Sequence, residues 1–336
     1  MVLTRRAYKA IPRWLPNEII TEIVQAAPRS DQASLCRVSK LFRDLCSPIL
    51  YRVVDLEANA SATDFGDTVL SNAALAGLVR SYSVHFPGAG MAGDALRFSQ
   101  VLADSSKALV RLEAFLGIAN GHWSDAEQHD RLASFLIRHP GLEKLHIQGF
   151  PHTLTPSSAS VRIPLPRLQH LRCPPRIIPS IVALRLKRVQ LYWNDDDLDE
   201  VENIFVALKA MTASDVPLIC SNNFVQYLYE VVDSVSRNLP HTKTLQLDSY
   251  HSPPLNEVIG HLKNCLPRFT GLAFLSVYNS SWDIPTQEEI SVLRDACPAL
   301  EAYRLQRRAW RKVDGMWETY PWTDFDALAG LESWTL

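Results

Sequence analysis

The sequence of 336 residues predicts an α/β fold in three parts: an N-terminal three-helix module, an α/β solenoid and a C-terminal β-hairpin cap. Three observations lead to this prediction. Helical apolar spacings are concentrated in residues 12–56, a strand-like apolar pattern recurs along residues 78–306, and an Asp-Gly turn separates two alternating runs within residues 307–336. Residues 57–77, rich in Ala, Ser and Asp, are expected to form a connector.

The first predicted helix begins at Leu15 and Pro16, because proline is tolerated in the first turn of a helix. Ile19 and Ile23 follow at a spacing of four residues, so they share one apolar stripe. Pro28 is expected to end this helix, since the residue before a proline avoids the helical region.

The remainder of the module predicts two more helices and a strand. Ser30 and Asp31 are candidate caps for the second helix. Ser39 is expected to cap a third helix at an angle to the second, and Pro48 is expected to close it before a strand at residues 51–56. The apolar positions share a face at spacings of three and four: Leu35, Val38, Phe42 and Leu45. So short a module buries little surface alone, which indicates that a partner or the next domain completes it.

The order of these residues resembles an F-box, in the form common in fungal F-box proteins. The matching segments are Leu-Pro-x-Glu-Ile-x3-Ile, Leu-x-x-Val-Ser-Lys-x-Phe-Arg-x-Leu and Pro-x-Leu-Tyr-Arg-x-Val. The resemblance implies binding to a Skp-type adaptor, which bridges to a cullin and a ubiquitin-conjugating enzyme. Carried over by position, the adaptor-facing candidates are Leu15, Pro16, Ile19, Ile23, Leu35, Val38, Phe42 and Leu45. Some of them are expected to pack inside the module instead, and spacing alone does not separate the two roles.

The pattern apolar-x-x-apolar-x-apolar recurs after the module, mostly at steps of 26 to 33 residues. Helices are expected between several of these strands, at 197–211, 222–238, 255–266 and 286–297. This self-similarity resembles a leucine-rich-repeat array, with strands on a concave sheet and helices outside. The array is degenerate, because its Asn or Cys ladder positions hold Phe150, Tyr250, Ser280 and Arg308. The alternative is an unrelated α/β domain built from βα units.

In such an array, side chains between the buried strand positions point to the concave face. We expect this face to hold a target protein, because a mixture of His, Arg, Tyr and Gln suits protein recognition. The main candidates are Lys144, His146, Arg172, Arg188, Tyr192, Gln246, Phe274, Tyr278 and Arg304. His85, Gln148, His170, Asp248 and Gln306 share the same pattern.

The C-terminal segment contains Asp314-Gly315 between two alternating runs, the sequence of a two-residue type I′ turn. We therefore expect a β-hairpin with Trp310 and Trp317 paired across it. The hairpin is expected to cover the open end of the solenoid.

Composition and motifs argue against several other functions. The net charge of −2 disfavours a nucleic-acid binder, and no apolar run is long enough to span a bilayer. The N-terminus lacks the apolar core of a secretory signal, and six dispersed cysteines are typical of reduced thiols inside the cell.

No metal, cofactor or catalytic site is expected. The cluster His122, Asp125, His129 and Asp130 has the wrong spacing for a helical metal site. The run Asp195, Asp197 and Asp199 begins like a calcium loop, but Glu200 and Val206 replace the required Gly and Glu. Nucleotide-binding and hydrolase motifs are also missing from the sequence.

The sequence therefore predicts a non-catalytic substrate-recognition subunit of a Skp–cullin–F-box ubiquitin ligase in the cytoplasm, the nucleus or both. Its expected partners are the adaptor, through it a cullin, and an unknown target protein. An interaction scaffold that contains an F-box but transfers no ubiquitin is the alternative, and an enzyme on an α/β scaffold has no supporting motif.

Overall fold

The computed structural model describes residues 16–57, 65, 68, 71–86, 111–116, 132–148, 161–193, 200–223, 228–249, 253–279, 281–282 and 287–331. Leu15, the cluster at 122–130, the acidic run at 195–199 and the ladder positions Phe150, Tyr250 and Ser280 lie outside these residues.

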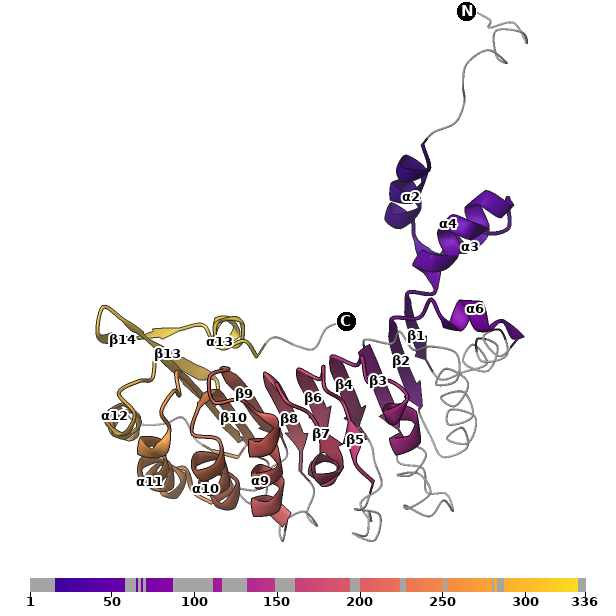
Figure 1. Ribbon diagram of the computed structural model, residues 1–336. Coiled ribbons are helices and arrows are strands. Elements are labelled where there is room, and N and C mark those ends of the chain that lie inside the picture. Colours follow the sequence, from indigo (N-terminus) through magenta and orange to yellow (C-terminus); the bar gives the residue numbers. More distant parts are fainter. Residues whose placement is uncertain are drawn as a thin grey trace, which may run out of the picture.

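A 12-stranded sheet organises the described part of the chain (Figure 1). Its strands pair in chain order, parallel as far as β12 and antiparallel after it, which is the topology of a solenoid. In spatial order they are β1 (Val53–Glu57), β2 (Ser81–Phe86), β3 (Arg111–Leu116), β4 (Lys144–Gln148), β6 (His170–Cys173), β8 (Arg188–Tyr192), β9 (Leu218–Asn223), β10 (Thr242–Ser249), β11 (Phe274–Asn279), β12 (Ala302–Leu305), β13 (Arg308–Val313) and β14 (Met316–Tyr320).

Helices α9 (Val201–Met211), α10 (Leu228–Asn238), α11 (Leu255–Cys265) and α12 (Gln287–Ala296) cover one face of this sheet (Figure 1). A further helical segment at 132–137 contributes Phe135 and Leu136 to the same core. The parallel register aligns equivalent strand residues into a buried row under the helices: Leu145, Leu171, Val189, Cys220, Leu245, Leu275 and Tyr303. Each unit therefore buries its apolar face against the next one, and the architecture is leucine-rich-repeat-like.

The short segment of chain that connects β6 to β8 contains no α-helix. Proline fixes φ and lacks a backbone N–H, and Pro175 and Pro179 lie here in the 3₁₀-helix η2 (Pro175–Ser180). Ile177 and Ile178 of η2 are buried in the core, so this turn takes the place of a longer outer helix. A two-stranded sheet of β5 (Ile163–Pro164) and β7 (Ile181–Val182) flanks it.

The C-terminal hairpin is formed by β13 and β14. Asp314 and Gly315 have φ values of 49° and 82°, and positive φ at both central residues is the requirement of a type I′ turn. The expected Trp310–Trp317 pair is wrong, because the register places Trp310 opposite Thr319 and Trp317 opposite Lys312. Both indoles instead contact the Tyr303 ring, with centroid distances of 5.0 and 4.9 Å.

A further helix, α13 (Trp322–Leu328), follows the hairpin and lies on the opposite face of the sheet from α9–α12 (Figure 1). Pro321 precedes it, and Gly330 ends it with a φ of +69°. The amide of Leu331 donates to the carbonyl of Asp326 at 2.7 Å, the long bond of a Schellman motif.

The N-terminal residues form α2 (Asn17–Ala26), α3 (Arg29–Leu35) and α4 (Lys40–Leu50), and a short helix α6 (Ala73–Ala76) follows β1. Ser30 and Asp31 do not cap α3, which begins one residue earlier after Pro28. Pro48 lies inside α4 instead of ending it; in the last turn of a helix it removes one backbone hydrogen bond. Among the described residues, none of the helices is long and apolar enough to cross a membrane.

Candidate protein-binding surfaces

The N-terminal helices are joined by polar contacts as well as by a small core. Ser39 caps α4 as expected: the amide of Phe42 donates to its Oγ at 3.2 Å. The buried Gln32 side chain donates from Nε2 to the carbonyls of Val24 and Ala27, both at 2.9 Å. Gln32 therefore satisfies carbonyls at the end of α2 and fixes α3 against it.

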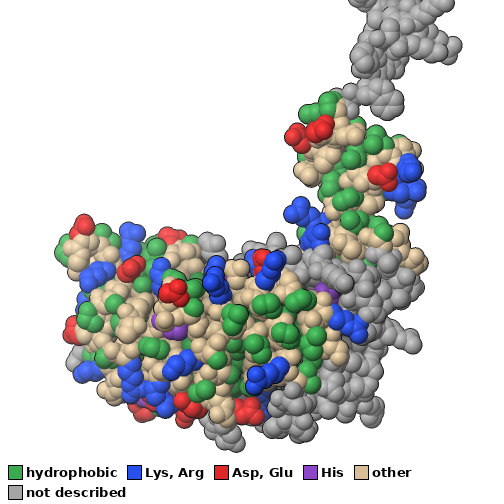
Figure 2. Space-filling model, viewed as in Figure 1, with side chains coloured by type: hydrophobic (Ala, Val, Ile, Leu, Met, Phe, Trp, Pro, Cys, Tyr) green, Lys and Arg blue, Asp and Glu red, His purple; other side chains and the backbone are tan. Residues whose placement is uncertain are grey.

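The predicted adaptor-facing residues that the structure describes differ in exposure. Val24 and Cys46 are fully buried, and Leu35, Phe42 and Leu45 are half-buried. Ile19, Ile23 and Val38 are 41%, 53% and 68% exposed, and Pro16 is exposed as well. Figure 2 shows hydrophobic side chains at the surface of this module, which projects from the body of the protein. Ile19 and Ile23 are four residues apart on α2 and so share one exposed helix face, and exposed apolar patches mark interaction sites.

The module joins the sheet through a very short connection. Only Tyr51 and Arg52 separate α4 from β1. The carbonyl of Arg52 accepts hydrogen bonds from the amides of Arg80 and Ser81, and the Arg29 guanidinium donates to the carbonyl of Val53. The junction is thus tied to both α3 and the segment that enters β2.

The face opposite α9–α12 carries the residues that the sequence predicted to contact a target. Register places Lys144, His170 and Arg188 in one row across neighbouring strands, and His146 beside Arg172 in the next. Lys144, Arg172 and Arg188 are half-buried, whereas His146 and Tyr192 are buried. The Arg172 guanidinium lies 4.8 Å from the centroid of the Tyr192 ring, and the His146 ring stacks on the same tyrosine. A basic and aromatic surface results.

The other half of this face is covered by α13. Phe274 and Arg304, expected to be accessible, are only 4% and 7% exposed. The fully buried Phe325 of α13 packs with Phe274 in an apolar cluster that includes Ala302 and Ala309. Arg304 Nη1 donates to Asp326 Oδ1 at 2.7 Å, and Thr244 Oγ1 donates to the carbonyl of Ala329 at 2.9 Å. Two of the predicted target-contacting residues are therefore occupied by the chain's own C-terminal helix.

The remaining residues that were predicted to contact a target lie on β10 and β11. Tyr278 and Gln246 are half-buried, and Gln246 Nε2 donates to Asp248 Oδ2 at 2.8 Å. Burial raises the pKa of Asp248 to about 6, although the charge of Arg304 and the Gln246 hydrogen bond oppose this shift. Asp248 is thus a carboxyl group that folding places in an unfavourable environment for its charge.

This burial predicts a pH dependence of stability. The folded pKa of Asp248 lies above the value of about 3.9 in an unfolded chain, so its contribution is most favourable below about pH 4 and is lost as the pH rises to about 6. We expect Asp248→Asn to raise the free energy of unfolding at about pH 7 by about 1–3 kcal/mol, with little difference at about pH 4. Urea titrations at both pH values measure this. If the wild type and Asp248→Asn differed in stability by the same amount at both pH values, Asp248 would not be the source of the pH dependence. Burial also raises the pKa of Asp326, but Asp326 is present in both proteins and does not contribute to their difference.

Sequence reasoning missed two features. It did not foresee α13, although Pro321 before it and Gly330 after it are ordinary start and stop signals. It also missed the grouping of Asp233, His261 and Cys265 on α10 and α11, of which only the His-x3-Cys spacing was visible in the sequence.

Comparisons with known proteins give shape similarity at low sequence identity. No protein-family model matches the chain, and no curated protein matches it either. One similar solved structure is a Bacteroides fragilis protein, with a TM-score of 0.47 and 15% identity over 71% of this chain and 68% of that chain. Another is the leucine-rich repeat-containing protein LegL7 from Legionella pneumophila, with a TM-score of 0.47 and 14% identity over 98% of this chain and 94% of that chain. A third is a chain of the yeast Rad7 and Elc1 complex, with a TM-score of 0.34 and 14% identity over 86% of this chain and 79% of that chain.

Proposed function

We propose that this chain is a non-catalytic substrate receptor of a Skp–cullin–F-box ubiquitin ligase, working in the cytoplasm, the nucleus or both. The observation that carries the proposal is the exposure of Ile19, Ile23 and Val38 on a helical module whose sequence resembles an F-box. A helix that keeps isoleucine at its surface gains from a partner that removes those side chains from water.

In this proposal the module docks on a Skp-type adaptor, and the leucine-rich-repeat-like sheet holds a target protein. The chain contributes no reacting group; it acts by placing target lysines near a ubiquitin-conjugating enzyme that the cullin recruits. The part of the sheet face that α13 leaves uncovered, with the half-buried Lys144 and Arg172, is the proposed target surface.

Reconstitution tests the proposal. The tagged full chain, mixed with purified Skp-type adaptor and cullin, is expected to elute from size-exclusion chromatography as a ternary complex. Ubiquitylation of a captured target in the presence of this complex would complete the test. An adaptor complex that excludes the cullin would favour the scaffold without ubiquitin transfer, and failure to retain the adaptor would refute both forms of the proposal.

A further inference from the structure

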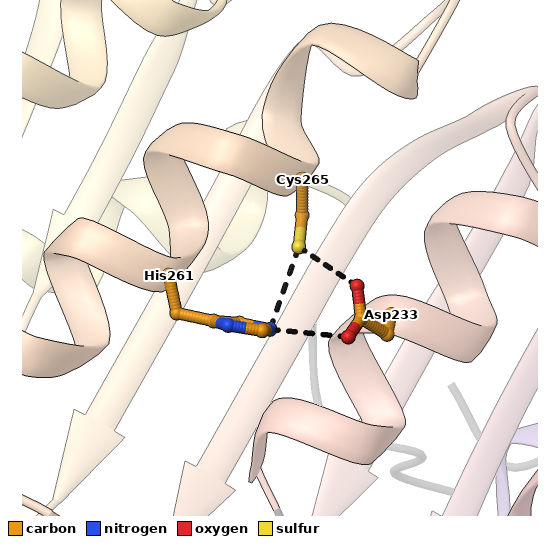
Figure 3. Close-up of side chains that lie close together, drawn as sticks. All are labelled: Asp233, His261 and Cys265. Carbon is orange, nitrogen blue, oxygen red and sulfur yellow. Dashed lines mark hydrogen bonds and ion pairs between the residues drawn. The ribbon is translucent and has the colours of Figure 1, made fainter.

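Three side chains with metal-binding atoms meet on the outer face of the solenoid (Figure 3). Asp233 comes from α10, and His261 and Cys265 come from α11, the next outer helix. Within the described residues, this is the one group that brings at least three His, Cys, Asp or Glu donors together. Figure 3 shows the thiol, the imidazole and the carboxylate turned toward one another.

The helices explain why these residues meet. His261 and Cys265 are four residues apart, so both project from the same face of α11. Val258 and Leu262 of α11 are buried toward the sheet, as are Val232 and Val235 of α10. Packing of the two apolar stripes therefore fixes the helix pair, and the three polar groups lie along its seam.

The donor groups lie close enough together to surround a small ion, with Asp233 Oδ1 beside the thiol and Oδ2 beside the imidazole. Cys265 Sγ lies 3.2 Å from Asp233 Oδ1 and 3.4 Å from His261 Nε2, and His261 Nε2 lies 3.6 Å from Asp233 Oδ2. Zn²⁺ bonds of about 2.0 Å to N or O and about 2.3 Å to S, at tetrahedral angles, separate neighbouring donors by about 3.3–3.6 Å. The three groups thus lie near this spacing before any ion is added.

Neighbouring side chains orient these groups. Arg268 Nη1 donates to Asp233 Oδ1 at 2.9 Å and lies 3.3 Å from Ser236 Oγ, which leaves Oδ2 facing the imidazole. The Tyr229 ring packs 4.5 Å from the His261 ring. Such outer contacts are typical of metal sites, where they fix the orientation of each ligand.

Charge also permits a cation. The Cys265 thiol is buried and lies beside the Asp233 carboxylate. Binding of an ion would release the thiol proton to solvent and form the thiolate that coordinates the metal. The thiolate and the Asp233 carboxylate then supply two negative charges against the single positive charge of Arg268.

We propose that Asp233, His261 and Cys265 bind a divalent transition-metal ion of the Zn²⁺ class, with water in the fourth position. A carboxylate, an imidazole and a thiolate are the three ligand types that Zn²⁺ takes in proteins. The bound ion would join the outer helices of two consecutive repeats. Because it binds the folded chain, it would also raise thermal stability.

Metal loading of the full chain tests the proposal. Protein stripped with a chelator is dialysed against Zn²⁺ and assayed for zinc, and the wild type is expected to hold about one ion per chain more than Cys265→Ser or His261→Gln. Cys297→Ser is the matched control, because Cys297 is a buried cysteine directly after the next outer helix, α12. Circular dichroism of each metal-free variant verifies that it is folded.

Co²⁺ supplies a readout that a purely structural role would not give. The wild type and Cys297→Ser are expected to show tetrahedral cobalt bands and a thiolate charge-transfer band, and Cys265→Ser is expected to lack the charge-transfer band. Added Zn²⁺ should raise the melting temperature of the wild type but not that of Asp233→Asn. Equal zinc contents in the wild type and Cys265→Ser, or a melting temperature that Zn²⁺ leaves unchanged, would show a hydrogen-bonded clamp and overturn the metal site.

Discussion

Ile23→Asp is expected to weaken binding to a Skp-type adaptor at least about 100-fold, because the interface would have to bury an unpaired carboxylate in place of an apolar anchor. The folded chain should tolerate the change, since Ile23 is 53% exposed and the substitution costs about 1 kcal/mol or less at such a site. Isothermal titration calorimetry with purified adaptor measures the affinity, and urea denaturation measures stability.

Val206→Asp is the matched control for this experiment. Val206 is 51% exposed on α9, an outer helix of the solenoid distant in the chain from the N-terminal module. The Val206→Asp substitution introduces the same charge at an equally exposed helical site, so the affinity for the adaptor should stay at the wild-type value. If Ile23→Asp and Val206→Asp bound the adaptor equally well, α2 would not be the docking surface.

The second large effect is expected from Phe325→Ala, which removes the apolar anchor of α13. Truncation of a buried phenylalanine costs about 3–5 kcal/mol where the site cannot collapse, and α13 can also detach locally. We therefore expect amide exchange at Ala329 and Leu331, whose N–H groups bond to carbonyls of α13, to accelerate about 100-fold. Hydrogen exchange with mass spectrometry measures this rate.

Leu328→Ala tests whether the effect belongs to Phe325 itself. Leu328 lies on the same helix, but its side chain is 52% exposed. Its truncation should leave the exchange of Ala329 and Leu331 close to that of the wild type. Acceleration of the same size in both variants would mean that the contact of Phe325 with Phe274 is not what holds α13 on the sheet.

Much of the repeat region was predictable from residue spacing. The triplets Leu142/Leu145/Ile147 and Leu272/Leu275/Val277 predicted strands because alternate residues of a strand face one side, and β4 and β11 lie there. The helix expected at 255–266 is α11, since its apolar residues recur every three or four positions. The apolar triplet Val216/Leu218/Cys220, which fits the recurring pattern less closely, overlaps β9.

The spacing of residues in the sequence does not predict which segment of the chain packs against each surface. The alternation in β11 shows that Phe274 points away from Leu275, but not that Phe325, 51 positions later in the chain, covers it. Likewise, His261 and Cys265 share a helix face, whereas their distance to Asp233 depends on how α10 and α11 are aligned along their seam. The exposure of Ile23 against the burial of neighbouring Val24 also follows from tertiary packing alone.

The two-residue turn between α4 and β1 has a consequence for a receptor of the proposed kind. A flexible linker would let a captured target sample many positions, and the effective concentration of its lysines at the transfer enzyme would fall as the linker lengthened. Here the first strand of the sheet follows the third helix of the module directly, and Arg29 and Arg52 pin the turn from both sides. The rigid junction would then fix the distance between the target surface and the adaptor, so that only lysines at a matching distance from the bound segment of the target would reach the transfer enzyme.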